Sequence, residues 1–349
     1  MKLRRAGQAG LCLLAAAVFA PACGPRQPKD LNDIVPTFSA NRTQIPLKSA
    51  IEATYTFECG PEMKKLSEDQ RVFVHFVDRE GTLLFTDDHL PAPAASTWEP
   101  GKKYSYTRTV FVPSYSYVGP VTVRLGLAAL SGGRKPRVAL KAKDAGLREY
   151  IVDKLEFLHE TKNIYVVQKD GWHDAETDPN NPGLERTWTK KEALVSFQNP
   201  KKDVIVYLEA NTSFKSFPQP PVLTVSIGKS GVVVPIPDSD VFLKKMRFRA
   251  ADLGAGEWVD LHLSMNGSFC PKTMGFSTDP RELSLMVSHL FVVEESLVGS
   301  LPTESVLNAT VLPAATTTKA PAARAVAAKP PAAKPPATAA KPKATPKAH

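Results

Sequence analysis

Residues 121–130, VTVRLGLAAL, decide the class of the fold. Large apolar residues alternate there with polar or small ones. One face of the extended chain carries Val121, Val123, Leu125 and Leu127, and the other carries Thr122, Arg124 and Gly126. Because successive side chains of a β-strand point to opposite faces, a period of two is typical of a half-buried strand. The pattern therefore predicts a β-strand with its valines and leucines in a core.

The same alternation extends over residues 35–160. Residues 72–77 and 104–112 repeat it, and turn signals such as Pro100-Gly101 separate the apolar segments. Short strands divided by frequent glycines and prolines indicate an immunoglobulin-like β-sandwich domain.

A second series of alternating segments runs from residue 163 to residue 295. Its expected strands are 164–167, 193–197, 203–210, 222–228, 258–265 and 283–294. The chain is therefore expected to be all-β, with two antiparallel β-sandwich domains, the second of them like a jelly roll. The roughly 280 residues between the two ends of the chain are enough for two domains of ordinary size.

The net charge of +9 comes from the two ends of the chain. Residues 1–30 hold five basic groups and one acidic group, and residues 314–349 hold seven basic groups and no acidic one. The 32 basic and 34 acidic groups between them nearly cancel. A near-neutral body argues against nucleic acid as a partner.

Residues 313–349 consist almost entirely of Ala, Pro, Lys and Thr, with no aromatic residue. Such a segment cannot bury enough apolar surface to offset the entropy of ordering, so we expect a disordered C-terminal tail. Two roles stay open for it. The basic tail lies by charge attraction on an anionic partner such as envelope polysaccharide, lipid headgroups or nucleic acid, or it is simply a solvated end.

The N-terminus carries an export signal. Lys2, Arg4 and Arg5 precede an apolar run over residues 11–20, which has half the length needed to cross a bilayer. The sequence that follows, APACG at 20–24, resembles the lipobox of bacterial lipoproteins.

That resemblance implies removal of a signal peptide over residues 1–22 and attachment of lipid, palmitate included, to Cys23. Residues 23–34 would then form a tether in the cell envelope, and Gly24 is compatible with sorting to the outer membrane. A plain secretory signal, cut near Ala22, is the alternative.

Two further resemblances concern the body. The segment VFVHFVDREGTLLFTDDHLP, residues 72–91, is similar to part of a β-sandwich module of bacterial envelope proteins and of some sugar-transferring membrane enzymes. It implies a fold and an envelope context, without a reaction. The segments DGWHDAE at 170–176 and ERTWTKKEALVSF at 185–197 resemble the start of a jelly-roll carbohydrate-binding module.

The sequence contains no pattern that assigns a reaction. It has no G-x-S-x-G motif, and neither Cys59 nor Cys270 has a histidine beside it in sequence. The acidic clusters lack the spacing of a calcium loop. We therefore expect no catalytic residue, no metal and no cofactor. Because one cysteine remains in each expected domain after export, a disulfide between Cys59 and Cys270 is possible.

Sugar binding is the chemistry with the best candidates. The polar segment 171–188, expected to be a loop, contains Trp172, His173, Arg186 and Trp188. An indole face stacks on a sugar ring, and neighbouring polar groups bond its hydroxyls. Alternatively, these tryptophans close one end of the core, and Trp98 and Trp258 allow the same two interpretations.

The expected function is that of a lipid-anchored envelope protein with a non-catalytic binding or scaffolding role. Its partners would be the membrane, through the anchor, and an envelope polysaccharide or an envelope protein. An enzyme or accessory subunit of polysaccharide metabolism, with its site within residues 168–190, is the alternative.

Overall fold

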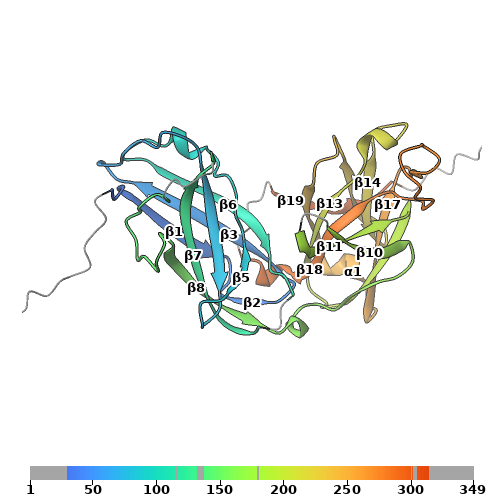
Figure 1. Ribbon diagram of the computed structural model, residues 1–349. Coiled ribbons are helices and arrows are strands. Elements are labelled where there is room, and N and C mark those ends of the chain that lie inside the picture. Colours follow the sequence, from blue (N-terminus) through green and yellow to red (C-terminus); the bar gives the residue numbers. More distant parts are fainter. Residues whose placement is uncertain are drawn as a thin grey trace, which may run out of the picture. The chain divides into compact units, whose positions relative to one another are not determined.

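A computed structural model describes residues 30–114, 117–131, 137–178, 181–299, 301 and 305–313. The expected signal peptide, Cys23 and nearly all of the tail lie outside these residues. Within them the chain is all-β, as the alternation predicts, and its strands form four sheets (Figure 1). The helical elements are short: α1 (Ala250–Leu253) and 3-10 turns at Ala95–Thr97, Glu160–Lys162, Phe214–Ser216 and Glu295–Leu297.

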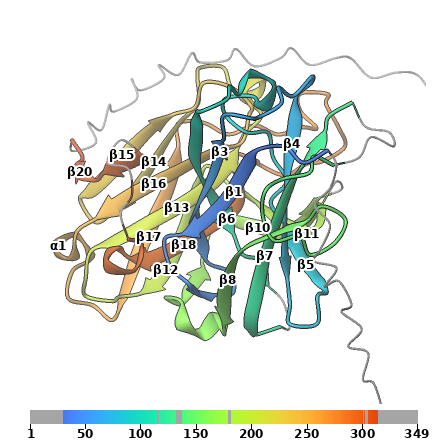
Figure 2. The ribbon, with the colours of Figure 1, turned by 90° about the vertical axis from the view of Figure 1, so that its left-hand side faces the viewer.

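Two sheets form the first sandwich (Figure 2). In spatial order, one contains β1 (Ile34–Ala40), β3 (Ala50–Cys59) and β6 (Lys103–Phe111). The other contains β2 (Gln44–Pro46), β8 (Tyr150–Leu158), β7 (Gly119–Ala129), β4 (Gln70–Val77) and β5 (Leu83–Thr86). The predicted strand at 121–130 corresponds to β7 (Gly119–Ala129), and its Val121, Val123, Leu125 and Leu127 are buried in the core between the sheets. Leu130 lies just beyond β7 and is exposed.

Trp98 belongs to this core. Its side chain is fully buried, packs on the ring of Phe57 and donates its indole N–H to the carbonyl of Pro93 at 3.0 Å. The structural interpretation of this tryptophan is therefore the correct one.

The second sandwich contains the other two sheets. One orders β10 (Trp172–Asp178), β11 (Asn181–Thr189), β18 (Met286–Glu294), β13 (Val204–Asn211), β16 (Phe242–Phe248) and β19 (Val306–Asn308). The facing sheet orders β20 (Thr310–Val311), β15 (Ser230–Pro235), β14 (Val222–Ile227), β17 (Trp258–Met265), β12 (Glu192–Gln198) and β9 (Val166–Gln168).

Every strand expected in this half is present. Neighbouring strands are antiparallel except for the short pair β16–β19. In the first sandwich the short pair β2–β8 is also parallel. The second sandwich also recruits β19 and β20, which lie beyond the expected boundary at residue 295.

The two sandwiches belong to one compact unit that ends at Leu312. A small apolar cluster joins them, and it contains Ala50, Phe111, Ile205, Tyr207, Phe291, Val293 and Val306. A buried ion pair lies in the same joint, because Lys245 Nζ is 2.8 Å from Glu52 Oε1. The hydroxyl of Tyr207 also donates to Glu52, at 3.1 Å.

No helix within the described residues is long and apolar enough to span a bilayer.

Candidate binding site

The expected loop at 171–188 is a β-hairpin of strands β10 and β11, so the expectation of a loop is wrong. Glu176 pairs with Arg186, and Thr187 pairs in turn with Val287 of β18. The hairpin therefore extends the sheet at its edge. The cluster of Pro, Asn and Gly in the middle of the segment is a hairpin signal, which the polarity of the flanking residues obscures.

The two tryptophans of the hairpin lie on opposite faces of the sheet. Trp172 pairs with Thr189, and directly paired residues share a face, whereas Trp188 and Thr189 are successive and alternate. Trp172 packs against the core and donates its indole N–H to the carbonyl of Leu194 at 2.9 Å. Trp188 packs edge-on against Phe269, with ring centroids 5.9 Å apart. The two rings cannot form one flat platform for a sugar.

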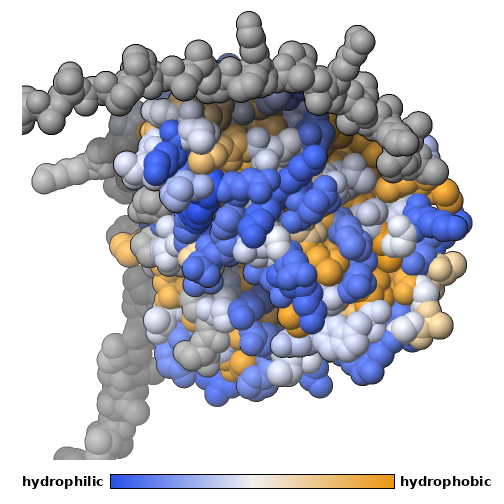
Figure 3. Space-filling model, turned by 90° about the vertical axis from the view of Figure 1, so that its right-hand side faces the viewer, coloured by the Kyte–Doolittle hydropathy of each residue, from blue (hydrophilic) through white to orange (hydrophobic). Residues whose placement is uncertain are grey.

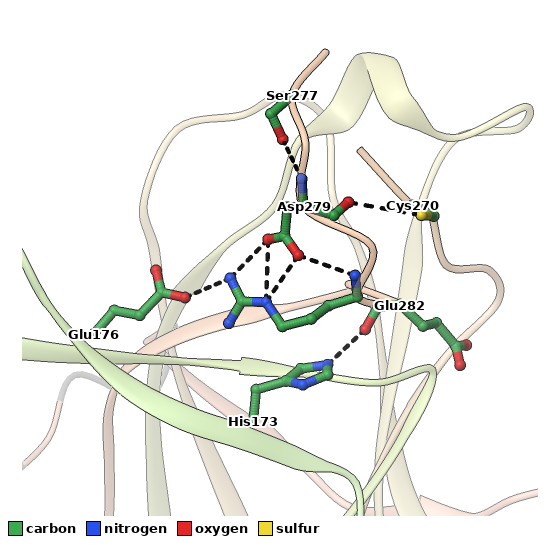
Figure 4. Close-up of polar contacts among 7 residues, drawn as sticks. His173, Glu176, Cys270, Ser277, Asp279 and Glu282 are labelled. Atoms are coloured by element: carbon green, nitrogen blue, oxygen red, sulfur yellow. Dashed lines mark hydrogen bonds and ion pairs between the residues drawn. The ribbon is translucent and has the colours of Figure 1, made fainter. Parts of the chain in front are cut away.

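The polar candidates of the hairpin are bonded within the protein. Arg186 forms an ion pair with the buried carboxylate of Asp178. His173 Nε2 lies 2.6 Å from the carbonyl oxygen of Glu282, so this ring nitrogen is the one that donates a proton (Figure 4).

A neighbouring ion-pair cluster fastens the hairpin to the segment before β18. Arg281 bonds Glu176 of β10 at 2.6 Å and the carboxylate of Asp279 at 2.7 Å (Figure 4). These hydrogen bonds lower the pKa of Asp279 to about 2. Because Arg281, Glu176 and Asp279 are paired with one another, we interpret this cluster as a structural fastening of the hairpin.

The possible disulfide is not formed, and both cysteines are free. Cys59 is buried in the core of the first sandwich, where burial raises the pKa of its thiol to about 11. Cys270 belongs to the second sandwich, and its thiol lies 3.8 Å from the carbonyl of Asp279. The two thiols therefore lie in different sandwiches, Cys59 buried and Cys270 partly exposed.

A different surface of the second sandwich offers a hollow. It lies on the outer face of strands β12 and β17, has a volume of about 440 Å³ and is lined by Lys169, Asp170, Leu194, Ser196, Trp258 and Asp260. The register Ser196↔Asp260 and Gln198↔Trp258 places the indole and the carboxylate of β17 on the same face.

The aromatic side chains at this hollow are exposed. Trp258 is 45% exposed, and the neighbouring Tyr165, 63% exposed, meets it edge-on with centroids 6.1 Å apart. Figure 3 looks onto the right-hand side of Figure 1, where hydrophilic residues surround separate apolar patches. An exposed indole among polar groups is unlike the tryptophans of the hairpin, which are half-buried against other residues.

Polar groups of the hollow remain available to a ligand. Ser196 Oγ donates to Asp260 Oδ1 at 2.5 Å, which orients that carboxylate. The side chains of Lys169 and Asp170 have no bonded partner within the described part of the chain. Among all the residues that the structure describes, no three or more His, Cys, Asp or Glu side chains are arranged to hold a metal ion.

Sequence reasoning named Trp258 but missed its neighbours. The period of two over 258–263 already places Trp258 and Asp260 opposite the buried Val259 and Leu261. No sequence pattern marks Lys169 and Asp170, because only their backbone hydrogen bonds to β12 bring them to this face. Lys169 N–H donates to the Leu194 carbonyl, and Leu194 N–H donates to the Asp170 carbonyl, each at 2.9 Å.

Comparison with known proteins assigns no family. No protein-family model and no curated protein matches the chain. Among solved structures, it is similar to tripeptidyl peptidase 2 (8% identity, TM-score 0.19, covering 74% of this chain and 20% of that one). It is also similar to pT26-6p (8%, 0.22, covering 80% and 65%) and to the CupB6 tip adhesin of Pseudomonas aeruginosa (8%, 0.17, covering 80% and 97%). At these TM-scores the similarities support neither a shared fold nor a function.

Proposed function

We propose that the protein is a lipid-anchored component of the bacterial cell envelope, in the outer membrane, with a non-catalytic role in binding envelope glycans. The lipobox-like sequence at Cys23 supports the anchor. The hollow beside the exposed Trp258 is the observation that carries the binding role.

The chemistry of the hollow suits a sugar ring. The exposed indole offers an apolar face for the C–H side of a pyranose. Asp260, Asp170 and Lys169 supply acceptors and a donor for its hydroxyl groups. A volume of about 440 Å³ lies within the range of small-ligand sites. The candidate polar side chains of the hairpin β10–β11, His173 and Arg186, are already bonded within the protein, so the proposed site is on the opposite sheet of the sandwich.

Replacing Trp258 with alanine is expected to weaken glycan binding about tenfold, because stacking contributes on the order of 1.5 kcal/mol. A glycan array first identifies a glycan that the full chain captures. Calorimetric titration with that glycan then measures the affinity of each variant. Val233→Ala is the matched control, since Val233 is also exposed and lies on β15 of the same sheet, outside the hollow. Equal affinity of Trp258→Ala and the unaltered chain would contradict the proposed site. A captured glycan that is cleaved instead would establish an enzyme.

Replacing Cys23 with alanine is expected to abolish fatty-acid labelling and release the protein from membranes, because its acyl chains supply the attachment. Metabolic labelling followed by membrane fractionation measures both effects. Cys12→Ala is the control, since Cys12 lies within the apolar run of the signal. Labelling that persists without Cys23 would overturn the anchor.

A further inference from the structure

Leu147 is an apolar side chain held in solvent by a strained turn. It is 85% exposed, more than any other large apolar residue that the structure describes. Its φ is +55° and that of Arg148 is +57°. Residues with a side chain rarely adopt this left-handed conformation, and two in succession indicate a backbone fixed by its surroundings.

The surrounding contacts account for this conformation. Arg137 Nη1 donates to the carbonyl of Leu147 at 3.1 Å, and Arg148 Nη1 donates to the carbonyl of Arg137. The N–H of Glu149 closes the turn on the carbonyl of Gly146 at 3.0 Å. Two arginines therefore hold the leucine outward, so its exposure is a fixed property of the fold.

The turn lies beside the point where the tether enters the body. Arg148 Nη2 is 2.7 Å from Asp30 Oδ2, and Asp30 is the first residue that the structure describes. Asp30 is only seven positions after Cys23 in the chain. A fully extended chain of that length spans at most about 25 Å. If Cys23 carries lipid, which is the proposal made above, the bilayer lies within that distance of Asp30.

The second sandwich joins the first at the other end of strand β3. Ala50, the first residue of β3, belongs to the joint, whereas Cys59, its last, pairs with Ile34 near the tether. Ten residues of β-strand cover about 30 Å. The end of the first sandwich that carries Leu147 is therefore the end beside the tether and away from the joint.

Charges at this end favour an anionic surface. The exposed side chains of Lys64, Lys65, Lys102 and Lys143 have no ion pair within the described ranges. The exposed acids without an ion pair at this end are Glu62, Glu99 and Asp144, so one positive charge is in excess. A basic surplus beside a membrane attracts anionic headgroups.

We propose that this end of the first sandwich rests on the phospholipid surface, with Leu147 inserted among the headgroups as an apolar contact next to the acyl anchor. The contact fixes the orientation of the body, so that the second sandwich and its hollow extend away from the bilayer. The occupant of this surface is the membrane to which the chain itself is attached.

A fluorophore at residue 147 tests the contact. Leu147→Cys and Val311→Cys are each introduced with Cys270→Ser, which leaves the buried Cys59 as the only native thiol of the body. Val311, 76% exposed on β20 of the second sandwich, is the matched control. The full acylated chain is reconstituted in vesicles of phosphatidylethanolamine and phosphatidylglycerol that contain a headgroup quencher. Flotation confirms attachment before quenching is read.

We expect several-fold stronger quenching at residue 147 than at residue 311, and a weaker difference after charge reversal by Lys64→Glu and Lys65→Glu. Equal quenching in vesicles that carry the floating chain overturns the contact and leaves the anchor intact. A chain that does not float overturns the anchor, and with it the contact that depends on it.

Discussion

Replacing Glu52 with alanine is expected to lower the free energy of unfolding by about 3–5 kcal/mol, because it leaves the ammonium group of Lys245 buried without a counter-ion. The exposed fractions of these two side chains are only 6% and 9%. Glu52 also accepts hydrogen bonds from the hydroxyls of Tyr207 and Thr109, each at 3.1 Å, and the variant leaves both donors unsatisfied.

The loss is expected to act at the joint, since Glu52 belongs to the first sandwich and Lys245 and Tyr207 to the second. Unfolding in guanidinium, followed by circular dichroism, measures the free energy and shows whether one transition separates into two. Glu58→Ala is the control on the same strand. Its ion pair with Lys103 has the same 2.8 Å length but is more than half exposed, so removing it costs about 0–1 kcal/mol.

The double variant Glu52→Leu with Lys245→Met removes both charges and is expected to recover much of the lost stability, because no buried charge is left unpaired. If Glu52→Ala costs no more than Glu58→Ala, the buried pair does not hold the sandwiches together.

Replacing Asp87 with alanine is expected to cost about 3 kcal/mol in the first sandwich. Its carboxylate, only 11% exposed, accepts two hydrogen bonds from Arg108, at 2.9 and 3.1 Å, and one from Tyr55, at 2.8 Å. Arg108 and Tyr55 belong to β6 and β3, whereas Asp87 follows β5 and bonds β4 of the facing sheet through its backbone. The carboxylate thus ties the two sheets together at one edge.

The same group predicts an acid dependence. Burial opposes ionisation of Asp87, but hydrogen bonds from His89 and Arg108 outweigh it and hold its pKa below the ordinary 3.8. Its contribution to stability is therefore complete above that value and is lost as the pH falls through the lower pKa of the folded protein. Unfolding free energies measured between about pH 2 and 6 are expected to fall more steeply for the unaltered protein than for Asp87→Ala.

Glu80→Ala is the control for both measurements, because Glu80 is an exposed carboxylate of the same sandwich. Its removal is expected to change the free energy of unfolding by less than about 0.5 kcal/mol. If Asp87→Ala retains the acid dependence of the unaltered protein, other carboxylates are responsible for it.

Asp87 also shows the limit of a motif. The sequence DDH at 87–89 indicates a polar turn, and its spacing says nothing about burial. In the structure, His89 is buried and its ring lies 2.9 Å from the hydroxyl of Tyr106. The partners of these residues come from strands distant in the chain, which no local pattern identifies.

The sequence by itself determined the fold class, because the alternation of apolar and polar residues is a local property that each strand carries, as in 121–130. The same alternation over residues 258–263 also puts Trp258 and Asp260 on one face of a strand, although only Trp258 is named as a candidate. Only the tertiary structure decided which candidates are accessible. The faces of Trp172 and Trp188 depend on the register of the hairpin β10–β11 and on the pairing of β11 with β18, which are about 100 residues apart in sequence. The hollow likewise exists only because Lys169 and Asp170 bond β12, whose other neighbour is β17. Strand pairing, unlike alternation, is a long-range property of the chain.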